Sequence, residues 1–106
     1  MTSEQKNTLL LIRNVIKSID PTSEVILFGS RARGDFWEES DWDILILIEK
    51  EKVLLEDERI FRHALYQLEL EISQPISIFV YPKQEWNGRL SVTPLFESVQ
   101  TEGIML

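Results

Sequence analysis

The apolar run Ile44-Leu45-Ile46-Leu47-Ile48 restricts the fold more than any other segment of this chain. A strand that exposes one face to water alternates apolar and polar residues, whereas a strand with apolar residues at every position is covered on both faces. We therefore predict that residues 42–48 form a central strand, covered on both faces or on one face plus a partner.

Further helices and strands are indicated by the apolar periodicity on either side of this run. The first helical pattern has Ser3 as a candidate N-cap and Asp20-Pro21 as a stop signal. Thr93-Pro94 opens a last helix, with threonine as N-cap and proline at the first helical position. The predicted elements in chain order are a helix over 4–19, strands over 24–28 and 42–48, a helix over 53–72, a strand over 76–81, a turn or short helix over 83–88, and the helix that Gly103 ends.

This order of elements predicts an α+β (mixed α/β) fold, with a small mixed β-sheet and helices packed mainly on one face. The length of 106 residues fits a single domain over residues 1–106. The apolar tail Ile104-Met105-Leu106 leaves two alternatives, because it could dock on the sheet or form part of a homo-oligomer interface.

Charge and composition exclude several classes of function. A formal net charge of −7 argues against broad binding of duplex nucleic acid, so any phosphate must be held locally, by a few cationic groups or a metal. The absence of cysteine excludes disulfides and thiolate metal sites, and it suits the cytoplasm. No apolar run approaches the length of a membrane span, so we expect no membrane association.

The segment from Gly29 to Ser40 is predicted to be a loop between two strands, with room for one helical turn after Gly29. Loops held by rigid strands are where functional residues tend to lie. The loop starts with two arginines next to glycines. Five carboxylates then follow within nine residues: Asp35, Glu38, Glu39, Asp41 and Asp43.

Asp41 and Asp43 are the candidate metal-binding and catalytic residues. Side chains of a strand alternate between its two faces, so both carboxylates project to the same side while Trp42 points into the hydrophobic layer. Two like charges held this close repel each other unless a positive group lies between them. Mg²⁺ fits, because it takes carboxylate oxygens and fills its other positions with water and substrate phosphates.

The residues around this pair are candidates for holding a nucleoside triphosphate. Gly29 allows a close approach of the backbone, and Ser30 offers a hydroxyl and a backbone N–H to a phosphate. Arg31 or Arg33 could neutralise the triphosphate by bidentate contacts. Ser40, just before the carboxylate pair, belongs to the same phosphate-binding set. The predicted chemistry is metal-assisted displacement at phosphorus.

Gly29-Ser30, ten residues and then Asp41-x-Asp43 resembles the signature of the DNA polymerase beta-type nucleotidyltransferases. With the short chain and the stretch 27–34, it resembles the minimal nucleotidyltransferase branch in particular. The resemblance implies a nucleotidyltransferase fold, Mg²⁺, and an NTP, commonly ATP, as donor of AMP to a hydroxyl acceptor. It also implies a small helical HEPN-type partner protein, in pairs that sometimes behave as toxin and antitoxin.

Catalytic members of that family usually carry a third carboxylate on the later strand, and this chain has Ser77 at the matching position. Serine is neither an anionic ligand nor a base near neutral pH. Two interpretations therefore stay open: an active nucleotidyltransferase, or a catalytically degenerate module that binds a nucleotide or a partner. Glu69 and Glu71 could substitute, but solvent-facing helix charges are the better interpretation of both.

Trp37 and His63 are two further residues whose side-chain types occur in functional sites. Trp37 lies in the loop over residues 29–40, called the motif loop below, where its ring could stack on a nucleobase or cap the core. The single histidine, His63, is predicted to be a surface or boundary residue of its helix and not a catalyst.

Overall fold

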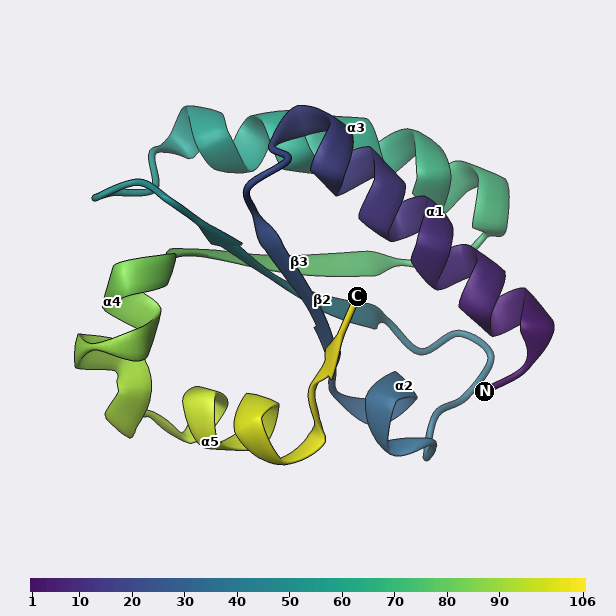
Figure 1. The fold of residues 1–106 in the computed structure, drawn as a ribbon. Helices are drawn as coiled ribbons and strands as arrows, with labels where there is room; N and C mark the ends of the chain where they lie inside the picture. Colours follow the sequence, from purple (N-terminus) through teal and green to yellow (C-terminus); the bar gives the residue numbers. More distant parts are fainter.

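A four-stranded sheet with the order β3-β2-β1-β4 lies at the centre of the protein in the computed structural model, which describes residues 1–106 (Figure 1). Its strands are β1 (Glu24–Phe28), β2 (Trp42–Ile48), β3 (Ile76–Pro82) and β4 (Ile104–Met105). Strand β2 pairs parallel with β3 and antiparallel with β1, and β1 pairs antiparallel with β4. The predicted mixed sheet is therefore confirmed.

The two longest helices, α1 (Ser3–Ile19) and α3 (Leu55–Ile72), pack side by side on one face of this sheet (Figure 1). Their amphipathic pattern puts Leu9, Ile12, Phe61 and Leu65 against the strands in the larger hydrophobic core. Helix α3 is also the crossover that a parallel β2–β3 pair requires.

The N-cap of α1 is Thr2, and the prediction of Ser3 was wrong by one residue. The Thr2 side chain accepts a hydrogen bond from the Gln5 backbone N–H at 3.1 Å, and the Gln5 side chain accepts one from the Thr2 N–H at 2.9 Å. This reciprocal capping box satisfies two N–H groups, one more than the N-cap side chain alone would satisfy.

Shorter helices cover the opposite face of the sheet: α4 (Lys83–Asn87), the 3₁₀ helix η1 (Arg89–Val92) and α5 (Pro94–Glu102). They enclose a second core in which Trp86 and Val99 pack against Leu45, Leu47 and Phe28. Strand β2 is thus covered on both faces, which is the first of the two alternatives that its continuous apolar run left open. The two longest helices share one face, and the shorter helices complete the other.

The C-terminal tail docks on the sheet. Ile104 and Met105 pair with β1 as strand β4, and the Leu106 N–H donates to the Val25 carbonyl at 2.8 Å. Thr93 caps α5 as predicted, because its side chain accepts from the Phe96 N–H.

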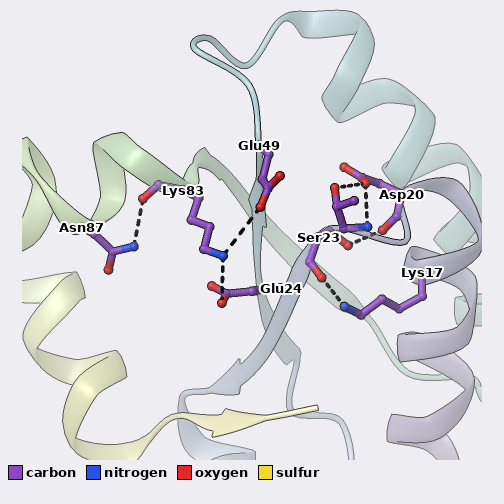
Figure 2. A network of polar contacts seen from close by, with 8 residues as sticks. Lys17, Asp20, Ser23, Glu24, Glu49, Lys83 and Asn87 are labelled. Carbon is purple, nitrogen blue, oxygen red and sulfur yellow. Dashed lines mark hydrogen bonds and ion pairs between the residues drawn. The ribbon is translucent and has the colours of Figure 1, made fainter.

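A polar network closes the end of the sheet where β1 begins and β2 ends (Figure 2). Lys83 lies between Glu24, at 3.3 Å, and Glu49, at 3.9 Å, and Lys17 donates to the Ser23 carbonyl at the turn after α1. The motif loop leaves the opposite end of β1, so this network is separate from the candidate site. None of the helices is both long and apolar enough to cross a membrane.

Candidate nucleotide and metal site

The carboxylate pair lies where β1 ends and β2 begins. Asp43 stands directly across from Phe28 of β1 and from Ser77 of β3. Trp42 is 2% exposed in the larger core, while Asp41 is exposed and Asp43 is half-buried. The alternation of strand side chains therefore places the two carboxylates on the side away from Trp42, as predicted.

Gly29 forms the bend that brings the loop past Asp43. Its backbone has φ +79° and ψ −161°, a conformation that only glycine adopts without strain. A Cβ atom at this position would lie 2.1 Å from Asp43 Oδ2. The sequence suggested that Gly29 allows a ligand to approach the backbone closely. In the structure, the group that approaches Gly29 closely is the Asp43 carboxylate.

A single helical turn, α2 (Ser30–Arg33), follows the bend, as predicted. Ser30 is its first residue, and its side chain is partly buried. The Ser30 carbonyl accepts from the Gly34 N–H at 2.9 Å, and Gly34 ends the turn in the left-handed conformation with φ +87°.

Arg31 is buried under the loop, with only 3% of its surface exposed. Its Nε donates to the Ser40 carbonyl and its Nη2 to the Glu38 carbonyl, each at 2.9 Å. The guanidinium carbon lies 4.7 Å from the Phe36 ring centre and 4.2 Å from the Trp42 ring centre. Burial lowers the pKa of Arg31, and the nearby Asp41 carboxylate opposes that shift. Arg31 thus holds the loop, and its guanidinium is not presented to an open phosphate site as the sequence had suggested.

Replacing Arg31 by alanine should destabilise the protein strongly. We expect a loss of about 2–4 kcal/mol of unfolding free energy, from carbonyls left without a donor and from lost cation–π contacts. Arg33→Ala, the same change two residues on, removes only the exposed ion pairs with Asp35 and Glu102 and should lower the unfolding free energy far less. Urea unfolding of both variants measures the difference, and equal losses would contradict the role assigned to Arg31.

Arg33 is the cation that stays at the surface beside the carboxylate pair. Its Nη1 contacts Glu102 Oε2 at 2.9 Å, and its Nε contacts Asp35 Oδ2 at 3.2 Å. These two partners raise the pKa of Arg33, with Glu102 the larger cause. Sequence reasoning missed Glu102, because it comes from the distant α5 and only the fold brings it to the loop.

Ser40 and Trp37 shape the end of the loop. The Ser40 hydroxyl accepts from the Trp37 N–H at 2.8 Å, and the Ser40 carbonyl is held by Arg31. Ser40 therefore closes a turn just before Asp41. The Trp37 side chain is 80% exposed, which rules out the alternative that it caps the core. His63 is exposed on α3, as predicted.

Ser77 lies beside both aspartates. Its Oγ donates to Asp41 Oδ2 at 2.7 Å, and its backbone stands in register with Asp43. Glu69 does not reach this position, because its carboxylate accepts from the Ile76 N–H at 2.7 Å at the start of β3.

The negatively charged form of Asp43 is disfavoured by its surroundings. Burial raises the pKa of Asp43, the neighbouring Asp41 raises it further, Arg33 lowers it and Glu102 raises it. The ionised form of Asp43 therefore lacks full compensation by positive charge. No group of three or more His, Cys, Asp and Glu side chains that could hold a metal ion occurs in the chain.

Sequence comparison finds related proteins for most of the chain. Residues 9–100 match the family model described as a nucleotidyltransferase domain. A Methanocaldococcus jannaschii protein named "Putative protein adenylyltransferase" is 46% identical over 65 residues, which make up 60% of this chain and 64% of that protein. The aligned part of this chain spans less than two thirds of that relative's length.

Two solved structures have a similar fold. A toxin–antitoxin crystallised with AMP-PNP matches with a TM-score of 0.64 and 19% identity, over 93% of this chain and 69% of that one. A mutant of the toxin–antitoxin MntA–HpeT matches with a TM-score of 0.63 and 21% identity, over 100% of this chain and 72% of that one. At these identities the likeness shows the fold, and it confirms the predicted nucleotidyltransferase-like architecture.

Proposed function

This chain belongs to the family of nucleotidyltransferase domains, and we propose that it transfers AMP from ATP to a hydroxyl group on a partner protein. The carrying observation is the pair Asp41 and Asp43, which project to one side of β2 next to the Gly29 bend. Asp43 is half-buried there without full compensation of its charge. Such a pair is suited to a cation and the phosphates that the cation brings.

The donor set at this place fits Mg²⁺. It consists of two carboxylates with the Ser77 hydroxyl beside them, and Mg²⁺ is commonly held by one or two carboxylates plus water and substrate phosphates. Asp41 and Asp43 would hold the ion. When bound, magnesium orients the triphosphate and offsets the negative charge that develops as pyrophosphate leaves.

Other residues of the loop would bind the nucleotide. The backbone at Gly29 and Ser30 would receive the phosphates at the start of α2. Arg33 is the arginine available to them, because Arg31 is buried; it would exchange its exposed contacts with Glu102 or Asp35 for a phosphate. The exposed Trp37 ring would stack on the nucleobase.

The partner is proposed to be a small helical protein of the HEPN type. Support comes from the toxin–antitoxin structures that share this fold and from the adenylyltransferase name of the relative. A cysteine-free, acidic chain that uses ATP would work with this partner in the cytoplasm.

A second candidate function is a binding module that holds a nucleotide or the partner without turnover. Ser77 favours it, because a hydroxyl stands where catalytic relatives are expected to carry a third carboxylate. A carboxylate there would help to activate the attacking hydroxyl, and serine does not accept a proton near neutral pH.

The deciding experiment compares wild type and Ser77→Asp. Each protein is incubated with radioactive ATP, Mg²⁺ and the product of the adjacent gene as acceptor. We expect measurable labelling by wild type and labelling up to about 100-fold faster by Ser77→Asp, since a positioned acid–base group contributes about that much. Calorimetry with Mg²⁺ and a non-hydrolysable ATP analogue measures binding in parallel.

The outcomes separate the two candidates. Labelling by wild type supports the transferase. Nucleotide binding without labelling by either protein supports the binding module. Absence of binding by both would overturn the assignment of the site.

A further inference from the structure

The Ser77 hydroxyl is hydrogen-bonded to the carboxylate pair. It donates to Asp41 Oδ2 at 2.7 Å from the neighbouring strand, at the position in register with Asp43. The Ser40 hydroxyl, which is close by in sequence, instead accepts the Trp37 N–H. Ser77 Oγ is therefore in direct contact with the carboxylate pair to which the cation is assigned.

We propose that Ser77 is an internal acceptor, so that the site adenylylates the Ser77 hydroxyl of its own chain. The inference rests on the proposed function, because it needs the same donor and the same two carboxylates. It extends that function by naming a covalent modification site within the protein.

The chemistry of the Ser77 side chain supports adenylylation at this position. A serine ends in a hydroxyl, which is a nucleophile, whereas an aspartate at the same position would end in a carboxylate, which is a base. Covalent catalysis uses a nucleophile with a proton acceptor within hydrogen-bonding distance, and Ser77 Oγ donates to Asp41 Oδ2 at 2.7 Å. Ser77 is partly exposed, so its hydroxyl is reachable from the surface that the loop lines.

The bonds of the step balance without another reactant. The Ser77 Oγ attacks the α-phosphorus of ATP and forms an O–P bond, while the bond between that phosphorus and the bridging oxygen breaks. Pyrophosphate leaves with the electron pair. The hydroxyl proton departs along the existing hydrogen bond to Asp41 and passes to solvent or to pyrophosphate. The product is a phosphodiester between Ser77 and AMP.

The test is mass spectrometry of the full chain after incubation with ATP and Mg²⁺. We expect a mass gain of one AMP residue, located by peptide mapping at Ser77. Ser77→Ala should lose the adduct completely. Ser77→Thr keeps a hydroxyl on a β-branched residue that suits a strand, so it should keep part of the adduct. Asp43→Asn keeps the acceptor but should lose the adduct, because the carboxylate pair is broken.

A mixing experiment tests whether the step occurs within one chain. Ser77→Ala retains both carboxylates, and Asp43→Asn retains the serine, so a mixture of the two should show no adduct on either. Labelling of Asp43→Asn in the mixture would overturn the intramolecular step.

Failure of this inference is distinguishable from failure of the proposed function. If wild type labels the partner but shows no adduct at Ser77, or if an adduct persists in Ser77→Ala, the internal acceptor is overturned and the transferase stands. If wild type neither binds Mg²⁺·ATP nor labels any protein, both proposals are overturned. Melting temperatures within a few degrees of wild type show that each variant is folded.

Discussion

Asp43→Asn is expected to lower nucleotide transfer by at least about 100-fold, since even the outer partners of metal ligands are worth about 10- to 100-fold. The amide keeps the shape of the side chain but removes the charge that would hold the cation. Transfer rates with ATP and Mg²⁺ measure the loss. Glu39→Gln is the matched control, because it makes the same acid-to-amide change at an exposed position of the same loop and should leave the rate nearly unchanged.

The same Asp43→Asn change should raise the melting temperature of the ligand-free protein. Burial and Asp41 raise the pKa of Asp43 above 3.8, so the folded state favours the protonated form and ionisation costs stability. This cost is absent below the unfolded pKa of about 3.8 and is fully present once the pH exceeds the raised folded pKa. The stabilising effect of the variant should therefore be present near neutral pH and should disappear at strongly acidic pH.

Two results would contradict this account of Asp43. A lower melting temperature of Asp43→Asn at neutral pH would mean that the ionised carboxylate is stabilised by contacts other than a cation. Undiminished transfer would remove Asp43 from the site. Both candidate functions predict that Asp43→Asn still binds the partner protein. Intact partner binding together with lost transfer would show that Asp43 acts in the transfer step and not in partner binding.

The sheet and the position of the carboxylate pair were predictable from the sequence because both depend on local periodicity. The unbroken apolar run of β2 indicated a strand covered on both faces or on one face plus a partner, and the structure shows a helix layer on each face. The one-residue spacing of Asp41 and Asp43 fixed their common side, since strand side chains alternate. The Thr93-Pro94 start of α5 was equally local.

What the sequence could not show depends on contacts between distant segments. Arg31 and Arg33 look alike in the loop, yet Arg31 is enclosed by Phe36 and Trp42 while Arg33 stays outside with Glu102 of α5. Only the packing of the loop against the core decides which arginine is buried. Strand β4 was missed for a similar reason, because two residues carry no periodicity and pair only when β1 offers an edge.

Gly29→Ala should produce a second large loss of stability and of nucleotide transfer, because an added methyl group would occupy the space of the Asp43 carboxylate. The new Cβ would lie 2.1 Å from Asp43 Oδ2, on a backbone with φ +79°. We expect a loss of about 3 kcal/mol or more, from about 1–3 kcal/mol of backbone strain and about 1–3 kcal/mol of overpacking. The displaced carboxylate should also reduce nucleotide transfer as strongly as Asp43→Asn does.

Gly34→Ala is the control that separates backbone strain at a positive φ from the steric clash of a new Cβ with Asp43. Gly34 also has a positive φ, +87°, but a Cβ there would meet nothing within 4 Å. Its replacement should cost about 1 kcal/mol, the strain of a left-handed residue, and should leave transfer nearly intact. Urea unfolding and the transfer assay on both variants test the difference. If Gly29→Ala behaves like Gly34→Ala, the bend is only a turn, and Asp43 does not need the space that glycine leaves. If only Gly29→Ala loses transfer, the glycine is required because its missing side chain leaves room for the Asp43 carboxylate.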